Sequence, residues 1–525
     1  MVCPPSRSRC LQPWSLGLAL IGVVILIRLW LAWLVPVTQD EAYYFDWARS
    51  LAWGYFDHPP GVALLGISAR LDPGSVLVSR LGGVLAGALT LLVLARLYRN
   101  CGLSRGPDLW LALLVFAGSL PGLAGGFLTS PDVALALAWA LALHESERAL
   151  AGERRRWLTV GIAVGLGLLS KYTMVVMGPV LLWTILRVDP HTLRTPWPYL
   201  GGLLALLVFA PNLSWNAHND WLSLRFQLGH GLATDSGTLV SGADSALQGR
   251  GTQITQSGPQ SLGEGLVSLL YFLGTQFALW GLIALPILAT PWLARRAQGA
   301  SPISQLTPRG GALLRSATWF PLGFFALISL KSDPEPNWPL VYLLAAPALL
   351  VPNWSRIRPW VVAAALGNLL LVSLYGFHAA TVALPLSDRQ NRVLRETHGF
   401  RELAEVVAGL DGPIYVDRYQ DTAMLRFYQP GIETTQWPGL TRPSEYLLGQ
   451  IAPKAEPKKI EGPFWLLARG RQAPEISGFR IVAHRVLIDC PGAPLAQTKE
   501  RPCARPLHRW SLYRYQPLSP VGKRS

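Results

Sequence analysis

The chain is built of long apolar blocks separated by short polar stretches as far as about residue 380. The blocks are about 15 to 25 residues long, and a helix needs roughly 20 apolar residues to cross a bilayer. The pattern predicts a polytopic α-helical membrane protein with about eleven transmembrane helices, give or take about two. The predicted spans are 14–35, 76–97, 108–128, 132–148, 157–170, 173–187, 198–215, 264–293, 312–330, 338–352 and 358–380.

The sequence after residue 384 has a mixed polar pattern instead. FRELAEVVAGL has helical spacing, whereas GPIYVDRY, GPFWLLARG, FRIVAHRVLIDC and RWSLYRYQ are typical of strands bounded by Gly and Pro. We therefore expect a transmembrane domain over 1–384 and a soluble α/β domain over 385–525. The first apolar block is too long for a signal-peptide core, and no small-residue cleavage site follows it closely, so we expect it to be retained as a span.

The distribution of arginine predicts the orientation in the membrane. If the N-terminus is cytoplasmic, the inside segments hold most of the arginines of the first domain, as the positive-inside rule requires. These arginines are Arg7, Arg9, Arg96, Arg99, Arg105, Arg148, Arg154, Arg155, Arg156, Arg187, Arg194, Arg295, Arg296, Arg309, Arg315, Arg356 and Arg358. The outside loops hold only Arg49, Arg70, Lys171, Arg225, Arg250 and Lys331. An odd number of spans places the first loop, 38–75, and the C-terminal domain outside.

Composition narrows the class of function. Half of the residues are hydrophobic and 15% are charged, fewer than in a typical soluble protein. The net charge of +15 could suggest a nucleic-acid partner, but the arginines lie in loops between apolar blocks, so we expect none. No P-loop or Rossmann glycine pattern indicates a nucleotide donor. Cys490 and Cys503 are the two cysteines expected outside, where disulfides persist, so we expect them to be bridged.

Two adjacent carboxylates, Asp40 and Glu41, follow the first predicted span. Asp40 could simply cap an interfacial helix, on which Tyr44, Trp47 and Leu51 share one face. Alternatively, one of the carboxylates could act as a general base on a substrate held at the membrane surface. Capping and catalysis are compatible, so both remain open.

Several further charged or titratable residues have a plain and a functional interpretation. Asp57 and His58 precede two prolines, which fix the backbone of what could be only a solvated turn. Asp132 follows a Ser-Pro pair at a helix start, where position alone could explain an acid. Lys171 could snorkel or bind an anionic phosphate. Arg28 lies inside the first span, where a charge is often functional but could also snorkel.

Six short motifs follow one another in order over about residues 14–350. Together they resemble the bacterial membrane glycosyltransferases of the GT-C class, in the protein-mannosyltransferase-like branch that includes the aminoarabinose transferases of lipid A. Each motif alone is weak, but their order and the agreeing topology make the resemblance strong. The motifs are Asp40–Glu41, Phe56–Pro60, Ser130–Asp132, Ser170–Tyr172, Asn216–Trp221 and Glu335–Pro339.

The resemblance implies a GT-C fold and an inner-membrane enzyme that moves a sugar from a polyprenyl phosphate to a periplasmic-side acceptor. That acceptor would be lipid A, another glycan or a protein. Asp40 would be the catalytic base, and Glu41, Asp57 and Asp132 would shape the site. The family's F-E-K-P turn becomes F-D-H-P here, so the lysine that contacts the lipid phosphate is replaced by His58. Lys171 or protonated His58 would have to supply that contact.

First principles agree with such chemistry. A phosphate monoester leaves well once cations neutralise it, so no cofactor should be required, whereas the role of a divalent metal stays open. A carboxylate can remove the acceptor's proton during the attack, and direct displacement inverts the anomeric centre.

Two other classes of function remain as alternatives. A transporter or flippase of a lipid-linked or small substrate would show internal repeats and functional charges near the bilayer midplane. A non-enzymatic assembly or anchoring protein would leave the loop carboxylates unexplained. An enzyme should bring Asp40, Asp57, Asp132 and Lys171 together at one cavity open to the outer leaflet.

Overall fold

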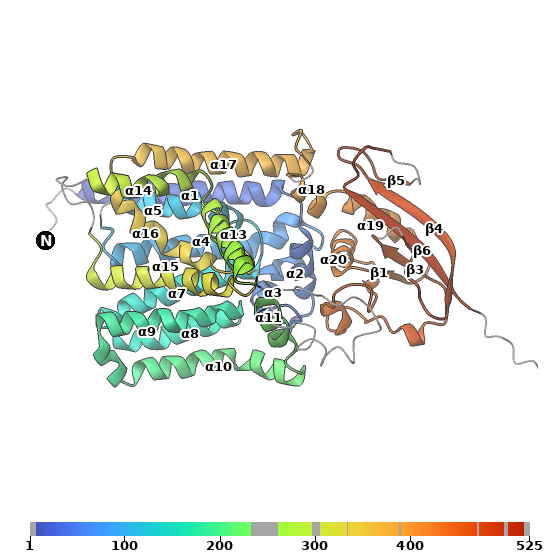
Figure 1. Cartoon of the computed structure of the whole chain (residues 1–525), viewed down its shortest axis with the longest axis horizontal. Helices are drawn as coiled ribbons and strands as arrows, with labels where there is room; N and C mark the ends of the chain where they lie inside the picture. Colours follow the sequence, from blue (N-terminus) through green and yellow to red (C-terminus); the bar gives the residue numbers. More distant parts are fainter. Residues whose placement is uncertain are drawn as a thin grey trace, which may run out of the picture.

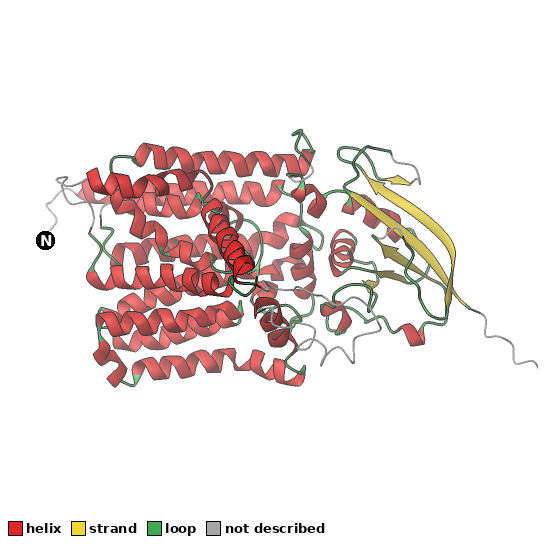
Figure 2. Ribbon diagram, viewed as in Figure 1, coloured by secondary structure: helices red, strands yellow, loops and turns green. Residues whose placement is uncertain are grey.

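The computed structural model describes residues 7–104, 106–232, 261–296, 305–332, 334–387, 390–469, 472–497 and 502–518. Helices form one body of the molecule, and a sheet forms the opposite end, as Figure 1 and Figure 2 show. A helical body followed by a C-terminal sheet domain is the arrangement that the sequence predicts.

The helical body is built mainly of long apolar helices that run alongside one another (Figure 1). Its α-helices are α1 Arg7–Leu34, α2 Gln39–Trp47, α3 Gly61–Leu65, α4 Val76–Asn100, α5 Gly106–Ala117, α6 Leu120–Ala124, α7 Pro131–Leu150, α8 Trp157–Leu168, α9 Met177–Val188, α10 Trp197–His218, α11 Leu222–Leu232, α13 Leu262–Ala278, α14 Ala284–Arg296, α15 Pro308–Ile328, α16 Ala346–Leu350 and α17 Arg358–Thr381. Short 3-10 helices connect them, at η1 Gly66–Arg70, η2 Arg154–Arg156, η3 Tyr172–Val176, η4 Pro190–Arg194, η5 Gly281–Ile283, η6 Leu340–Leu344 and η7 Val351–Asn353.

The predicted count of eleven spans is not confirmed. Within the described ranges, α4, α10, α15 and α17 are each long and apolar enough to cross a membrane, and two bent pairs bring the count to 6 at most. Predicted span 108–128 divides into α5 and α6, because Ser119 caps α6 and Pro121 lies in its first turn. Predicted span 338–352 divides into η6, α16 and η7, with Pro347 and Pro352 at two of the starts. Mean hydropathy does not register such breaks.

One bend directly shapes the end of the helical body that faces the sheet domain. α1 and α2 meet at 96°. Pro36 follows the end of α1, and Thr38 begins α2 with a capping box in which its side chain accepts from the Glu41 N–H while the Glu41 side chain accepts from the Thr38 N–H. The chain therefore turns sharply there, and the first loop lies across the end of the helical body beside α3 and α11 (Figure 1).

The C-terminal domain contains one mixed sheet, with strand order β2-β1-β3-β6-β4-β5. β1 pairs in parallel with β2 and β3, whereas the remaining pairs are antiparallel. Cys490 and Cys503 form a disulfide at the end of β4, which confirms the predicted bridge. The elements are α18 Arg392–Thr397, α19 Phe400–Ala408, β1 Ile414–Val416, α20 Tyr419–Tyr428, β2 Thr434–Gln436, η8 Glu445–Leu447, η9 Pro457–Lys459, β3 Phe464–Ala468, β4 Phe479–Asp489, β5 Ala496–Gln497 and β6 His508–Pro517.

The first loop and the C-terminal domain share one hydrophobic core. Buried Tyr43 and Trp47 of α2 belong to the same cluster as Phe400, Trp465 and Trp510 of the domain. α19 and α20 lie between the sheet and the helical body (Figure 1), and α20 packs against α2. The domain is therefore seated directly on the loop that carries the first predicted motif.

Polar contacts reinforce this junction between α2 and α20. The Arg426 guanidinium donates to buried Asp46 at 2.6 Å, and the Tyr446 hydroxyl donates to the same carboxylate at 2.9 Å. The backbone N–H of Phe56 donates to Glu445 at 2.6 Å. Burial raises the pKa of the Glu445 carboxyl to about 8, although the Phe56 N–H opposes the shift.

Candidate active site

Glu41 is locked into the protein interior. Its side chain is 2% exposed, and Arg80 of α4 donates to both of its oxygens, from Nε at 2.8 Å and from a terminal nitrogen at 2.6 Å. The backbone N–H of Thr129 donates to Oε1 at 2.9 Å. Arg80 also donates to the backbone carbonyls of Ala32 and Val35 at the end of α1. This network ties together α1, α2, α4 and the segment before α7.

Asp40 has the opposite environment, although it is the adjacent residue. Its side chain is exposed, and its carboxylate forms no hydrogen bond or ion pair within the described parts of the chain. Desolvation by the surrounding protein, followed by the negative charge of Glu396, raises the pKa of Asp40 to about 6. The carboxylate therefore keeps free lone pairs and has the affinity for a proton that a general base needs.

Asp57 is buried at the junction with the C-terminal domain. The Tyr43 hydroxyl donates to its Oδ2 at 2.9 Å, and Arg442 of the domain lies 2.8 Å from its Oδ1. The Arg442 guanidinium stacks over the Tyr419 ring at 4.3 Å. Glu445 completes the chain of contacts, because its backbone N–H donates to the Tyr43 hydroxyl at 2.7 Å. One side of the candidate site thus comes from the C-terminal domain.

His58 lies in the tight turn between this network and α3. Its carbonyl accepts from the Tyr55 N–H at 3.1 Å, and its ring lies 6.2 Å from the Tyr44 ring. α3 then approaches the end of α8 closely, because a Cβ on Gly61 would lie 2.8 Å from the Cα of Ser170. Glycine at this position lets the turn that carries His58 pack beside the segment that carries Lys171.

Asp132 connects three of the six motifs, because its carboxylate binds side chains from two others. Its Oδ1 accepts from the Lys171 ammonium at 2.7 Å, and its Oδ2 accepts from the Asn337 amide at 2.8 Å. Lys171 is only 4% exposed, so it does not snorkel to the surface. The neighbouring Tyr172 hydroxyl accepts from the Asn216 amide at 3.2 Å, which brings a fourth motif to the same region.

The carboxylates of the first loop and of α7 converge around Tyr44. Desolvation first, and then the charges of Asp40, Asp57 and Asp132, raise the pKa of the Tyr44 hydroxyl well above its ordinary value. The structure thus gathers these three acids on one end of the helical body, with Lys171 attached through Asp132 and His58 beside Tyr44. Glu41 belongs instead to the Arg80 network.

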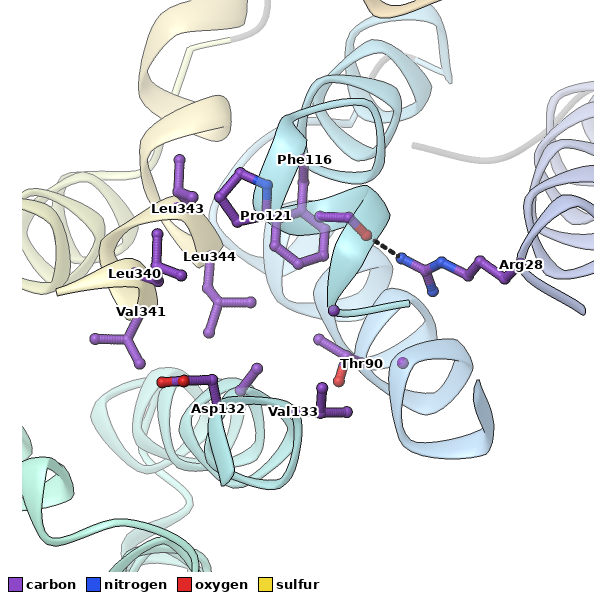
Figure 3. A pocket seen from close by; sticks show the side chains of 14 residues that line it. Arg28, Thr90, Phe116, Pro121, Asp132, Val133, Leu340, Val341, Leu343 and Leu344 are labelled. Atoms are coloured by element: carbon purple, nitrogen blue, oxygen red, sulfur yellow. Dashed lines mark hydrogen bonds between the residues drawn. The ribbon is translucent and has the colours of Figure 1, made fainter. Parts of the chain in front are cut away.

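A cavity of about 70 Å³ lies beside Asp132, among α1, α4, α5, α6, α7 and η6. Figure 3 shows Asp132 at one side of this cavity and Arg28, which donates to the Gly122 carbonyl at 2.9 Å, at another. Asp40, Asp57 and Lys171 are not among its lining residues. The predicted single cavity with all four residues on its wall is therefore not what this cavity shows.

Sequence reasoning missed several members of the site. Arg442 and Glu445 come from a part of the tail with no recognisable motif, and only the folded domain brings them to the first loop. Arg80 was detectable in principle, because it is a charge inside predicted span 76–97 and such charges are often functional. In the described residues, no group of three or more His, Cys, Asp or Glu side chains is arranged to hold a metal ion.

Comparisons with known proteins agree with the motifs. Residues 57–215 match the model of the family "Dolichyl-phosphate-mannose-protein mannosyltransferase". A curated relative, the lipid A galacturonosyltransferase RgtD of Rhizobium johnstonii, is 28% identical over 195 residues. The matched segment covers 35% of this chain and 40% of that relative's length.

Similarity to solved structures extends over nearly the whole chain. ArnT from Cupriavidus metallidurans bound to undecaprenyl phosphate matches with a TM-score of 0.62 and 15% identity, over 96% of this chain and 98% of that one. The same protein in the apo state gives a TM-score of 0.60 at 15% identity, over 95% and 97% of the two chains. At this identity the likeness establishes the fold. The family match, the curated relative and the shared fold together support a GT-C glycosyltransferase, which confirms the family resemblance seen in the sequence.

Proposed function

We propose that the chain transfers a sugar from a polyprenyl phosphate to an acceptor on the periplasmic side of the inner membrane, with inversion of the anomeric centre. The observation that carries the proposal is that the Asp40 carboxylate has no bound cation. Glu41, Asp57 and Asp132 are each bound to a cation, whereas the Asp40 carboxylate is exposed and unbound in the described structure. It is therefore the acid of this cluster that is free to accept a proton.

The proposed reaction is a single displacement at the anomeric carbon. The acceptor hydroxyl oxygen attacks that carbon, the bond from the carbon to the phosphate oxygen breaks, and the hydroxyl proton passes to Asp40. The phosphate leaves as the monoester of the polyprenol, with one more negative charge than it carried in the donor. Nearby cations must stabilise that charge, and Lys171 and protonated His58 are the candidates in the outer site.

The other acids position the site in this proposal. Both Glu41 oxygens are engaged with Arg80, Thr38 and Thr129, so Glu41 fixes the bend that presents Asp40. Asp57 connects the first loop to Arg442, and Asp132 holds Lys171. The cluster lies at the end of the helical body beside the sheet domain, which favours an enzyme at the membrane surface over a transporter with charges at the midplane.

The identities of the donor and acceptor are inferred from related proteins. The similar ArnT structure holds undecaprenyl phosphate, which favours a polyprenyl-phosphate carrier here. The matched relative is a lipid A galacturonosyltransferase, which favours lipid A or a similar glycolipid as acceptor over another glycan or a protein. We expect no cofactor to be required, and metal dependence is a separate question for the assay.

The test is transfer by the purified protein in lipid nanodiscs. A set of polyprenyl-phosphate sugars is offered with lipid A, the product is identified by mass spectrometry, and its anomeric configuration is determined by NMR. We expect one donor to give a glycosylated lipid A of inverted configuration, and a parallel assay with EDTA measures the metal dependence of transfer. No transfer from any polyprenyl-phosphate sugar to lipid A, glycan or protein acceptors would refute the reaction, and retained configuration would refute the single displacement.

A further inference from the structure

Arg28 is a buried cation without a carboxylate partner in the described structure. Its side chain is 2% exposed within the helical body, so it does not snorkel to the membrane surface. One terminal nitrogen donates to the Gly122 carbonyl at 2.9 Å, but Nε and the other terminal nitrogen have no hydrogen-bond partner among the described residues. An incompletely bonded guanidinium is unfavourable in the interior, so a ligand should complete its contacts.

The surroundings hold this guanidinium in one place. A Cβ on Gly126 would lie 1.9 Å from the Arg28 Nε, and a Cβ on Gly87 would lie 3.1 Å from Nη1. Any larger residue at position 126 would therefore displace the charged group. Close packing against two glycines, together with the bond to Gly122, fixes the guanidinium before any ligand arrives, as a binding site requires.

The cavity beside Arg28 suits a ligand with one anionic end and an apolar remainder. Arg28, Thr90 and Asp132 are its polar side chains, and the rest of its wall is mostly apolar, including Phe116, Val133 and Leu344. Figure 3 shows the Arg28 guanidinium directed from α1 toward this space. At about 70 Å³ the cavity has room for the anionic end of such a ligand and for little of its apolar remainder.

The other cations near the site are already paired with carboxylates, so a bound phosphate would be stabilised most by a cation that has no such partner. Lys171 is bound to Asp132 at 2.7 Å, Arg442 to Asp57 at 2.8 Å, and Arg80 to Glu41 at 2.6 Å. Each of these positive charges is already balanced by a buried or half-buried carboxylate. Arg28 brings a positive charge that is balanced by no carboxylate in the described structure, in a cavity that reaches Asp132 and hence the Lys171 pair.

We infer that Arg28 binds the phosphate of the polyprenyl-phosphate carrier at this cavity. The inference rests on the proposed function. It identifies a residue that binds the phosphate and that lies outside the six motifs. When the bond between the anomeric carbon and the phosphate oxygen breaks, the phosphate gains a negative charge. Arg28 stabilises that charge from the membrane side, opposite the Asp40 side of the sugar.

The test compares two probes that differ only in the phosphate. Binding of undecaprenyl phosphate and of undecaprenol to the purified chain in nanodiscs is measured for the unaltered protein, for Arg28→Gln and for Arg28→Lys. Glutamine keeps a donor for the Gly122 carbonyl but loses the charge. We expect Arg28→Gln to bind undecaprenyl phosphate about 10- to 100-fold more weakly while undecaprenol binding is unchanged, and Arg28→Lys to keep most of the preference.

Two further variants act as controls. Gly126→Ala keeps the charge but displaces the guanidinium, so it should also lower the preference for the phosphate. Arg70→Gln should change neither affinity, because Arg70 donates to backbone carbonyls of the first loop outside the cavity. The inference would be overturned if Arg28→Gln and Gly126→Ala kept the full preference for undecaprenyl phosphate over undecaprenol. It would also be overturned if these variants lost affinity for both probes equally. If the unaltered protein shows no preference for undecaprenyl phosphate, it is the proposed donor that fails.

Discussion

The acids around the first loop differ mainly in what is bound to them. Glu41 is enclosed by Arg80 and two backbone N–H groups, and Asp57 and Asp132 each hold a cation. Asp40 lies next to Glu41 in sequence, but the α-helix turns adjacent residues by about 100°, so Glu41 faces the interior and Asp40 is exposed. Capping, the plain interpretation of the pair, is performed through Thr38 and Glu41. Asp40 is left free for chemistry.

The raised pKa of Asp40 predicts how turnover depends on pH. A general base acts in its deprotonated form, so activity should fall as the pH decreases through about 6, the pKa of Asp40, and level off above it. An ordinary aspartate would place that fall near 3.8. The measurement is kcat/KM for sugar transfer between about pH 4.5 and 8.5, within the stable range of the protein.

Glu396 provides a matched control for this pH dependence. Its negative charge helps to raise the pKa of Asp40, so Glu396→Gln should move the acidic limb of the profile to lower pH. Glu396 also pairs with Arg392, and freeing that arginine acts in the same direction. Asp40 would not be the titrating base if the acidic fall in kcat/KM stayed at the same pH in Glu396→Gln. Activity that rises as the pH falls would also contradict this role.

At the scale of elements, the residues of the candidate site lie at the ends of helices. The bend of 96° between α1 and α2 places Asp40 at the end of the helical body beside the sheet domain, and the start of α7 presents Asp132 to Lys171 just after α8. Hydropathy predicted the long helices α4, α10, α15 and α17 well, because each contains a long and mainly apolar stretch without a break. It could not predict the breaks at Ser119 and Pro347, because capping and proline interrupt a helix without changing its mean hydropathy.

The contact between α2 and α20 should stabilise the site as a unit. Arg426 is largely buried against Asp46, and removing one partner of such a pair leaves an uncompensated charge. We therefore expect Arg426→Met to lower the free energy of unfolding by about 3 kcal/mol and to reduce turnover as α2 loosens. Thermal unfolding in detergent measures the first effect, and the transfer assay measures the second.

Lys459→Met is the control for that variant. Lys459 pairs with Glu456 on the exposed surface of the same domain, where ion pairs contribute little. It should leave both the melting temperature and turnover unchanged. Equal effects of the two variants, or a fully stable Arg426→Met, would show that the junction does not depend on this pair.

At the scale of the whole molecule, the site is shared between two parts of the chain that are distant in sequence. The motifs predicted Asp40, Asp57, Asp132 and Lys171 because each stands beside a recognisable helix boundary. Arg442 and Glu445 follow no such boundary, and they reach Tyr43 and Asp57 only because the sheet domain is seated on α2. These contacts join residues about 400 positions apart, so no local pattern in a single sequence can predict them.

The orientation of the molecule follows from the arginine distribution and remains a prediction. Fusion of a reporter that is active only outside the cytoplasm should give signal after residue 390 and none near Arg155. A reporter active only in the cytoplasm should give the reverse. Signals in the opposite sense would place the Asp40 cluster on the cytoplasmic side and overturn the assigned periplasmic acceptor.

The most direct test of the central claim is the turnover of Asp40→Asn. Asparagine keeps the size of the side chain but cannot accept the proton, so sugar transfer from the polyprenyl-phosphate donor should fall by about 10²- to 10⁴-fold. Donor binding and thermal stability should be unchanged, because Asp40 forms no hydrogen bond or ion pair within the described residues. Glu41→Gln, which disturbs the Arg80 network, should instead lower stability and reduce turnover less. Near-normal turnover in a folded Asp40→Asn variant would contradict its role as the base.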